Sequence, residues 1–462
     1  MKTQDIESYL SSFPNYEVNL TEKKYVDFSL CRIHALLKKM CDPQEALTIV
    51  HVAGSKGKGS TCVMVAHILK AAGYVVGLYT SPHLYRLNER IRLLRPEQDK
   101  KKIRVASGQV LYDDEIAAEE LADVIRALKP VLDGSRFHPE QGYLTYFELL
   151  TALGLYYFRE QKADVAVLET GLGGRYDATN SVDADCIAIT SISLEHTALL
   201  GTSLPAIARE KVAIVKHSDQ RVVLAPQSSD VLHVLQSYCA RLQVNPIMAQ
   251  EPIGGQIVKS HGSGCGQVFN VQSSRGRYKN LFLPLLGAHQ RINAAVAIEL
   301  AEQLKALSFK VHPQDIRQGL SDIFWPIRFE VLQHAPVMIL DAAHNAYSMS
   351  LLAQDVQDLY PQRKVYALVG FLKDKNVQAM FDVLSRFSDE IIVTQSHHPR
   401  AYACEEMDVR LAKNMVSLMT IKNVEEAVEC VLAKARPEDV IVVSGSIFVV
   451  AHVRQYMVLK NA

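Results

Sequence analysis

"LTIVHVAGSKGKGST", residues 47–61, joins a short apolar run to a segment rich in glycine and lysine. The run over 47–53 is typical of a buried strand, and the amphipathic pattern over 60–72 predicts a helix directly after the glycines. A strand, a glycine-rich loop and a helix in this order form the basic unit of α/β folds. The stretch therefore predicts an α/β protein with a binding loop at the end of one strand.

The glycines between this strand and helix are suited to hold phosphates. Gly54, Gly57 and Gly59 let the backbone curve so that its N–H groups point at one anion, next to the N-terminus of the helix. Lys58 is placed to reach the β- and γ-phosphates, and the hydroxyl of Ser60 or Thr61 to face a metal ion. The spacing differs from the common pattern G-x-x-x-x-G-K-[ST], and a flexible turn is the alternative. The flanking strand and helix favour phosphate binding.

Further apolar runs rich in Val and Ile alternate with helical patterns, which predicts a parallel sheet covered by helices on both faces. Strands are predicted at 75–81, 164–171, 186–192 and 221–226, and helices at 146–161 and 204–216. Residues 253–286 predict two strands around a Ser-Ser-Arg-Gly turn, a small antiparallel sheet. The polar stretch 95–109 is expected to form a surface excursion.

A second alternating block starts near Trp325 and predicts a smaller Rossmann-like domain. The chain of 462 residues exceeds what one core usually serves, so two domains are expected. We place them at residues 1–324, a P-loop ATPase-type parallel-sheet domain that includes the antiparallel sheet, and residues 325–462.

Composition narrows the class of protein. The chain is 48% hydrophobic and 22% charged, with 50 basic and 50 acidic residues, which argues against a protein that coats nucleic acid. No apolar stretch reaches the length of a membrane span, and the N-terminus lacks the pattern of a signal peptide. The eight cysteines show no C-x-x-C pair, which fits a reducing compartment. A soluble cytoplasmic protein is expected.

Several polar residues stand where the strands of the first block end, the place where ligands collect in α/β sheets. Glu169 ends one strand and is able to hold Mg²⁺, although a strand-end ion pair explains it equally well. Glu195 and His196 follow another strand, and a structural histidine is the commoner case. Lys211, on a predicted helix, reads from local sequence as an exposed charge.

The rear half has similar candidates. Gln290 and Asn293 lie one turn apart on one face of a predicted helix, and Arg328 follows the only tryptophan where the domains are expected to meet. Asp341 and His344 follow a predicted strand. Helix capping and turn formation would explain any one of these residues. Together they place ligand-capable side chains at strand ends in both domains.

The glycine spacing that departs from the common P-loop resembles the version G-T-N-G-K-G-S of the folylpolyglutamate synthase and dihydrofolate synthase family, within the Mur ligase superfamily. The resemblance continues in the family's order from about residue 45 onward. The matching stretches are "GLYTSPHLYRLNERIRL", "LTYFELLTA", "LETGLGGRYDATN", "TSISLEHTALLGTSLPAIAREKVAIVK", "HQRINAA", "WPIRFE", "LDAAHN" and "VVSGSIFVVAHVR". It implies a Mur-ligase-type ATP-binding domain followed by a glutamate ligase domain.

The resemblance also implies roles for individual residues. The loop Gly57, Lys58, Gly59 and Ser60 would cradle the ATP phosphates, and Asn293, Arg328, Asp341 and His344 would lie at the nucleotide. Mg²⁺ would be held by Ser81, Glu169 and His196, with Ser60 near it. Lys211 matches a lysine that carries a carbamate, which supplies the anionic oxygens that magnesium prefers.

For the acid substrate, the resemblance implies a pterin site made by Thr145, Tyr146, Phe147 and Glu148, together with Tyr176, Asp177 and Ala178. Taken alone, the stretch around "TYFELLTALGLYYF" would be a core helix. Three departures from the family pattern are Glu195 in place of Asp, Ile327 in place of Gly, and Ala346 in place of Pro. None removes a proposed ligand.

The activity implied is ATP-dependent amide formation. A carboxylate of dihydropteroate or a folate attacks the γ-phosphate, and the amine of L-glutamate then attacks the acyl phosphate. Lys58, Lys211, His196 and Arg328 are the expected catalytic residues, with ATP and Mg²⁺ required. We expect small-molecule substrates, no nucleic acid or membrane partner, and a monomer.

Three other functions are left open. A peptidoglycan Mur ligase is the nearest, although only about fifty residues precede the loop where an N-terminal UDP-sugar domain would be expected. A binding protein that slowly hydrolyses ATP and a phosphoryl-transferring kinase are the others. Dependence of ADP release on both the acid and glutamate separates the ligase from the last two.

Overall fold

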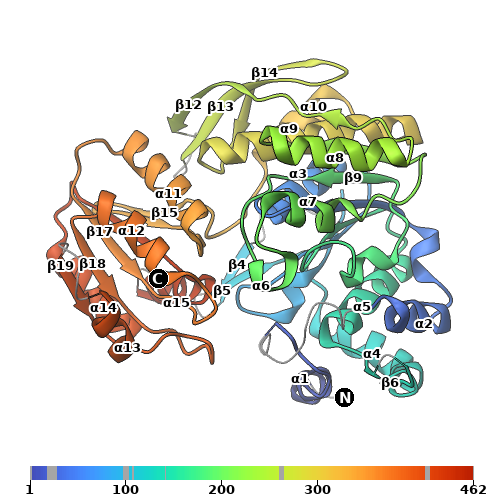
Figure 1. Cartoon of the computed structure of the whole chain (residues 1–462), viewed down its shortest axis with the longest axis horizontal. Helices are drawn as coiled ribbons and strands as arrows, with labels where there is room; N and C mark the ends of the chain where they lie inside the picture. The colour runs from blue at the N-terminus through green and yellow to red at the C-terminus, as the bar shows by residue number, and fades with distance from the viewer. Residues whose placement is uncertain are drawn as a thin grey trace.

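The structure is a computed structural model and describes residues 3–17, 29–96, 103–106, 109–140, 142–259, 265–411 and 417–460. Figure 1 shows two lobes, a larger N-terminal one on the right and a smaller C-terminal one on the left, each built around its own sheet. Helices and strands alternate in both lobes, which confirms the predicted α/β class.

The larger lobe contains, within the described residues, a seven-stranded sheet in the order β11-β10-β9-β1-β8-β2-β3. The strands are β1 (Thr48–Ala53), β2 (Val76–Tyr79), β3 (Ile91–Leu94), β8 (Val165–Glu169), β9 (Cys186–Ile189), β10 (Arg221–Leu224) and β11 (Ile247–Met248). All pair in parallel except β3, which runs antiparallel to β2 at the edge. The strand before the glycine-rich loop, β1, therefore lies in the interior of the sheet.

Both faces of this sheet are buried, as expected for parallel strands. Along β1, Ile49 and Ala53 belong to one core, and Val50 and Val52 belong to the other. The first core contains residues of α1 (Thr3–Ser11), α2 (Cys31–Lys39), α4 (Ala118–Asp133), α5 (Tyr146–Glu160), α7 (Leu204–Val212) and α8 (Ser229–Arg241). The second contains residues of α3 (Lys58–Ala71), α9 (Ala288–Leu304) and α10 (Pro313–Ser321).

A small antiparallel sheet covers part of the second core, at the top of Figure 1. Its strands are β12 (Ile253–Lys259), β13 (Cys265–Gln272) and β14 (Arg277–Leu283). The predicted turn connects β13 and β14, where the N–H of Ser273 donates to the carbonyl of Gly276 at 2.8 Å. The prediction of two strands missed β12. This strand begins Ile-Gly-Gly, a sequence in which the alternation expected of a strand is absent.

The smaller lobe holds a six-stranded sheet in its described part, in the order β15-β16-β20-β17-β18-β19. The strands are β15 (Glu330–His334), β16 (Val337–Leu340), β17 (Val365–Val369), β18 (Glu390–Val393), β19 (Ser417–Thr420) and β20 (Val440–Ser444). The helices are α11 (Ala346–Leu359), α12 (Val377–Phe387), α13 (Cys404–Leu411), α14 (Val424–Lys434) and α15 (Ile447–Lys460). The predicted alternation of strands and helices is present, with β16, β17, β18 and β20 in the interior and β15 and β19 at the edges.

The remaining elements are short. They are the helices η3 (Pro43–Ala46), η4 (Leu87–Arg90), η5 (Ala178–Ser181), α6 (Thr197–Leu200) and η6 (Lys305–Leu307), and the strands β4 (Ile103–Ala106), β5 (Gln109–Tyr112), β6 (Phe137–His138) and β7 (Gly142–Tyr143). The polar stretch 95–109 thus leads into an antiparallel hairpin of β4 and β5. Residues 97–102 and 107–108 lie outside the described part.

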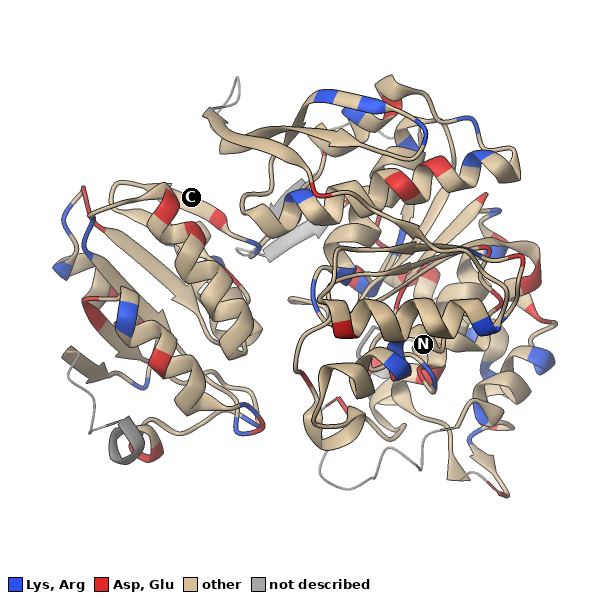
Figure 2. Cartoon of the chain, turned by 45° about the horizontal axis from the view of Figure 1, so that its top comes forward, with Lys and Arg blue, Asp and Glu red and all other residues tan. Residues whose placement is uncertain are grey.

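Figure 2 shows Lys and Arg interspersed with Asp and Glu along the ribbons of both lobes. Across the residues that the structure describes, no helix has the length and apolar character needed to cross a membrane.

The connection between the lobes has an unusual backbone. Ile327 has a φ of 53° and Phe329 a φ of 49°, both in the left-handed region that favours glycine. Ile327 is 2% exposed and packs into the core of the smaller lobe. The family pattern has Gly at position 327, and the geometry explains why: this position needs a conformation that a β-branched residue rarely adopts. Here the burial of Ile327 offsets the strain.

Candidate active site

The glycine-rich loop is packed tightly against the elements around it. Gly57 precedes α3 with a φ of 87°, and a Cβ atom there would lie 2.1 Å from Oδ1 of Asn293 on α9. A Cβ atom on Gly54 would lie 1.8 Å from Oγ1 of Thr190, just after β9. The loop therefore requires glycine for both its backbone shape and its close contacts.

Two lysines point back at this loop. The ammonium of Lys58 donates to the carbonyl of Gly54 at 3.0 Å, and the ammonium of Lys211 donates to the same carbonyl at 2.8 Å. Lys211 is 1% exposed, so the prediction from local sequence of an exposed charge was wrong. Helix α7 carries Lys211 on its buried face, and the fold brings it across 157 residues to the loop.

Glu169, at the end of β8, lies on the other side of the loop. Its Oε2 accepts a hydrogen bond from the backbone N–H of Ser81 at 3.1 Å. A Cβ atom on Gly59 would lie 3.2 Å from that oxygen and 3.3 Å from Cζ2 of Trp325. Burial raises the pKa of Glu169, while the positive charge of Lys58 opposes the shift. Glu169 thus places a buried carboxylate beside the start of α3, where it accepts a hydrogen bond from one backbone N–H.

Glu195, His196 and Lys211 form a second charged group. The ammonium of Lys211 lies 2.7 Å from Oε1 of Glu195. Burial alone would raise the pKa of Glu195, but Lys211, Lys58 and neighbouring cations hold it well below its usual range. Burial lowers the pKa of Lys211, although Glu195 opposes the shift. Burial lowers the pKa of His196 to about 4, so its imidazole is neutral at pH 7.

The loop also contacts the smaller lobe through a residue that sequence reasoning did not select. Nζ of Lys56 lies 3.3 Å from Nε2 of His344. Burial lowers the pKa of Lys56 to about 8. The charge of Lys56 and burial together hold the pKa of His344 well below its usual range. The sequence feature that could have indicated Lys56 was its position within the loop, where the family pattern has Asn.

Asp341, at the end of β16, organises the connection between the lobes. Its Oδ2 accepts from the backbone N–H of Phe329 at 2.9 Å, and its Oδ1 accepts from that of Ala343 at 2.8 Å. Burial raises the pKa of Asp341, and Arg328 opposes the shift, so the two charges lie close enough to interact. On the larger lobe, Nδ2 of Asn293 donates to Gln290 at 3.1 Å.

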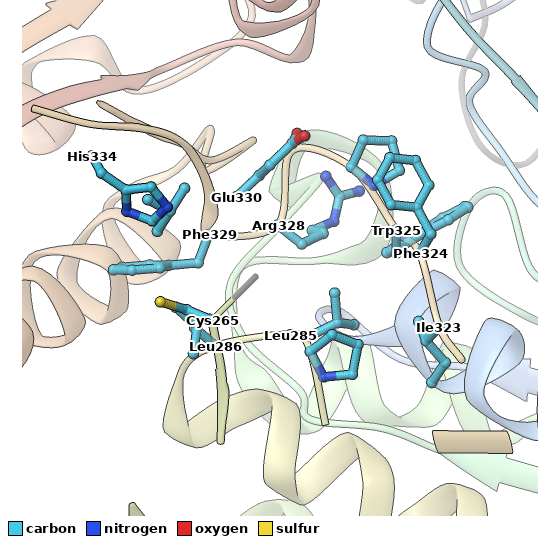
Figure 3. Close-up of a pocket in the computed structure, with 13 residues that line it drawn as sticks. Cys265, Leu285, Leu286, Ile323, Phe324, Trp325, Arg328, Phe329, Glu330 and His334 are labelled. Carbon is cyan, nitrogen blue, oxygen red and sulfur yellow. The ribbon is translucent and has the colours of Figure 1, made fainter. Parts of the chain in front are cut away.

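A pocket of about 220 Å³ lies where the lobes connect. Figure 3 shows Arg328 among apolar residues that include Trp325, Phe329 and Leu285. The indole N–H of Trp325 is buried and, in the described chain, has no hydrogen-bond acceptor. A mainly apolar pocket that also presents Arg328, Glu330 and His334 suits a flat aromatic ligand that carries hydrogen-bonding groups.

The residues proposed for the pterin begin helix α5. Thr145 and Glu148 form a capping box, with Glu148 N–H donating to Thr145 Oγ1 at 3.2 Å and Thr145 N–H donating to Glu148 Oε2 at 2.7 Å. Arg32 donates to Glu148 from Nε at 3.1 Å and from Nη2 at 2.9 Å. Glu148 is therefore already engaged in structure. A Cβ atom on Gly171 would lie 2.6 Å from Phe147, so this turn packs against the end of β8.

The second group of pterin candidates lies beyond that strand. Asp177 is buried and accepts from the backbone N–H groups of Leu172 at 2.7 Å and Thr179 at 3.0 Å. Tyr176 is 40% exposed, whereas Ala178 is buried at the start of η5. Of these residues, Tyr176 presents the largest accessible surface.

The oxygen donors around Glu169 decide whether Mg²⁺ fits the proposed metal site. In the described residues, no three histidine, cysteine, aspartate or glutamate side chains are grouped to hold an ion. However, Glu169 supplies a buried carboxylate beside Gly59, and the hydroxyls of Thr61 and Thr170 are buried with no described partner. Oxygen donors of this kind at a phosphate loop fit Mg²⁺, which takes few protein ligands and keeps phosphate and water.

Comparison with known proteins agrees with this architecture. Residues 135–301 match the Mur ligase middle domain, and residues 327–447 match the Mur ligase, glutamate ligase domain. The folylpolyglutamate synthase of Lacticaseibacillus casei is 32% identical, covering 92% of this chain and 93% of that protein. The dihydrofolate synthase/folylpolyglutamate synthase of Escherichia coli is 31% identical, covering 98% and 97%.

Solved structures agree as well. The Mycobacterium tuberculosis folylpolyglutamate synthase complexed with ADP superposes with a TM-score of 0.84, at 27% identity over 98% of this chain and 97% of that one. A complex of folylpolyglutamate synthase (FPGS) with AMPPCP and folate superposes with a TM-score of 0.81, at 28% identity over 99% of this chain and 100% of that one.

The fold and the two matched domains define an ATP-dependent ligase of the Mur type. Within that class, the chain belongs to the folylpolyglutamate synthase and dihydrofolate synthase family.

Proposed function

We propose that this ligase joins L-glutamate to the carboxylate of 7,8-dihydropteroate, of a reduced folate, or of both. The names of the relatives and the folate-bound FPGS structure support this choice of substrates. The observation that carries the proposal is the approach of Lys56 to His344, because it brings the phosphate loop against the strand ends of the other lobe. A triphosphate on the loop would then face the lobe matched to glutamate ligation.

The chemistry proposed needs positive charge rather than a nucleophile on the protein. A carboxylate oxygen of the acid bonds to the γ-phosphorus of ATP as ADP leaves. The glutamate amine then bonds to the acyl carbon, phosphate leaves, and the amine loses a proton. Lys56 and Lys58 belong to the loop, and Arg328 lies close enough for its charge to act on Lys56 and Glu169, so the three cations would stabilise the transferred phosphoryl group.

The proposed nucleotide contacts come from both lobes. Gly57, Lys58, Gly59 and Ser60 would bind the phosphates, and Asn293, Arg328, Asp341 and His344 would complete the nucleotide site. The contact geometry of Gly57 with Asn293 and the interaction of Arg328 with Asp341 support this grouping. The pterin would lie between the first turn of α5, Thr145–Glu148, and residues 176–178.

Mg²⁺ would be held by Glu169 with Ser81, Ser60 and His196 nearby, and would supply charge neutralisation at the phosphates. We propose further that Lys211 becomes a carbamate. Its lowered pKa leaves more neutral amine to bond to the carbon of CO₂ with loss of a proton. The carbamate would be anionic beside Glu195, so the modification requires a cation to replace the present ion pair.

Three broader expectations belong to this proposal. Residues 1–324 and 325–462 would act as two domains that close on the nucleotide. All eight cysteines are free thiols, which supports a reducing, cytoplasmic location. A monomer is expected, with each chain carrying a full site.

The test is an ADP-release assay with each substrate omitted in turn. ADP release is expected only when the acid, glutamate and ATP are all present, with glutamylated product formed in equal amount. Steady ADP release without the acid and glutamate would instead support a binding protein that slowly hydrolyses ATP. Stable accumulation of a phosphorylated acid would support a kinase.

A further inference from the structure

A buried arginine outside the proposed ligand set is paired with a carboxylate from the N-terminal segment. Nη1 and Nη2 of Arg90 donate to the two oxygens of Glu17 at 2.7 and 2.6 Å. Nε of Arg90 donates to Nδ1 of His83 at 2.9 Å. The Arg90 side chain is 2% exposed, whereas that of Glu17 is 35% exposed. Each of the three guanidinium nitrogens therefore donates a hydrogen bond, two to Glu17 and one to His83.

The site needs an anion because a buried guanidinium cannot lose its charge. Glu17 meets that need with the two-oxygen geometry that arginine prefers for carboxylates. Glu17 is partly open to solvent and is 73 residues from Arg90 in sequence. Its carboxylate therefore occupies a place that another carboxylate of the same shape would fit.

This place neighbours one of the proposed pterin contacts and, through His83, the segment that reaches Glu169. The guanidinium carbon of Arg90 is 5.9 Å from the ring centre of Tyr146, in the first turn of α5. His83, its other partner, is two residues from Ser81, whose N–H contacts Glu169. An acid that reaches from the pterin site toward the phosphate loop would pass Arg90.

A cation of the smaller lobe acts on the same carboxylate. Arg400 lies close enough for its charge to favour ionised Glu17. Arg400 contacts Asp374 at 3.1 Å, and its Nε is buried with no acceptor among the described residues. Arg400 thus adds positive charge from the smaller lobe near the carboxylate that Arg90 binds.

The geometry points to Arg90 as the binding residue for the non-reacting carboxylate of a glutamylated folate, with Glu17 as the internal carboxylate that competes for it. This inference rests on the proposed function. Dihydropteroate has only the carboxylate that is activated, whereas a folate carries an additional one on its glutamate. Glu17 therefore sets the choice of acid by favouring dihydropteroate over glutamylated folates.

The experiment compares kcat/KM for tetrahydrofolate with kcat/KM for dihydropteroate in the wild-type protein and in Glu17→Gln. Glutamine keeps the shape of Glu17 but removes its charge. The ratio of the two constants is expected to rise by about tenfold or more, since a charge-assisted hydrogen bond is redirected to the substrate. The rise should come mainly from a lower KM for tetrahydrofolate.

Two further variants sharpen the test. Glu160→Gln removes an exposed carboxylate that pairs with Arg159 at 2.9 Å, and it should leave the ratio unchanged. Glu17→Gln combined with Arg90→Gln removes both charges together, so no buried cation is left without a partner. In the double variant the ratio should return to the wild-type value or fall below it.

An unchanged ratio in Glu17→Gln, with both substrates still ligated, would overturn this inference and leave the proposed function intact. A gain that persists in the double variant would also overturn it. If the wild-type protein ligates neither acid, the proposed function itself fails.

Discussion

The ammonium of Lys211 lies 2.7 Å from the carboxylate of Glu195, and both side chains are almost fully buried. Removing one member of such a pair leaves the other charge buried and unsatisfied. We predict that Lys211→Ala lowers kcat by about a hundredfold or more, as loss of an electrostatic group at a reacting centre commonly does. Short carboxylates added to the assay should restore part of the activity.

Lys129→Ala is the control for this prediction. Its ion pair with Asp133 is exposed and contributes little. Unchanged turnover in Lys211→Ala would show that neither the ion pair nor a carbamate at this position matters for the reaction. Mass spectrometry of the native protein tests the carbamate directly, through the added mass of one CO₂ on the peptide that contains Lys211.

Gly57 in the glycine-rich loop and Gly73, which follows α3, have similar backbone angles and can be compared. Gly57 has a φ of 87° and an added Cβ atom would meet Asn293, whereas Gly73 has a φ of 95° with nothing within 4 Å. Gly73→Ala should cost about 1–2 kcal/mol of backbone strain. Gly57→Ala should cost roughly 1–3 kcal/mol more, because atoms must shift, and should raise the KM for ATP.

Thermal unfolding and ATP kinetics measure both effects. Equal stability losses in the two alanine variants, with an unchanged KM for ATP, would contradict the tight packing of this loop against α9.

The lowered pKa of Lys56 predicts a pH dependence. Burial brings this pKa to about 8 from an ordinary value of 10.5. We expect kcat/KM for ATP, which reports the free enzyme, to fall as pH rises through about 8, since the ammonium loses its charge. Lys56→Arg should move this alkaline limb to higher pH, while Lys129→Arg should not.

Stability should change in the opposite direction. Between about pH 8 and 10.5 the unfolded chain binds the proton that folded Lys56 has lost, so the free energy of unfolding rises with pH in that window. Lys56→Met should lack this rise. An alkaline limb identical in wild type and Lys56→Arg would assign it to another group.

Glu148 tests whether the start of α5 is a structural turn, a substrate contact, or both. Glu148→Ala removes the capping box and leaves buried Arg32 without this partner, so it should destabilise the fold by about 3–5 kcal/mol. Glu120→Ala removes a similar capping residue on α4 without a buried arginine, and should cost about 0.5–2 kcal/mol.

Glu148→Gln keeps the shape and most of the hydrogen bonds. The KM for the acid substrate and the urea unfolding of this variant should be measured together. A raised KM with unchanged stability would support a substrate role for Glu148. Stability equal to wild type in Glu148→Ala would contradict the buried ion pair.

The sequence indicated the interior of both sheets because interior parallel strands are continuous apolar runs. Runs such as 164–171 and 186–192 are present as β8 and β9. Edge strands were missed for a physical reason. Strand β3 carries Arg92 in its centre, and β12 has two glycines directly after its first residue, so neither shows the pattern of a buried strand.

The candidate site was only partly accessible from local sequence. Strand ends indicated Glu169 and Asp341 as candidates, because each stands at the end of a parallel strand, at the carboxyl edge of its own sheet. The burial of Lys211 and the pairing of Arg90 with Glu17 depend on contacts between distant segments, 157 and 73 residues apart, which no local pattern encodes. Lys56 was passed over because the family pattern directs attention to the residues after it.

The central claim is that the γ-phosphate of ATP is transferred to the carboxylate of the acid before glutamate attacks. The most direct measurement uses an acid whose carboxylate carries a heavy-oxygen label and analyses the phosphate released. The account predicts that one labelled oxygen appears in the phosphate for each amide formed, since the acyl phosphate breaks at its acyl carbon. Phosphate that takes its new oxygen only from water would contradict the account.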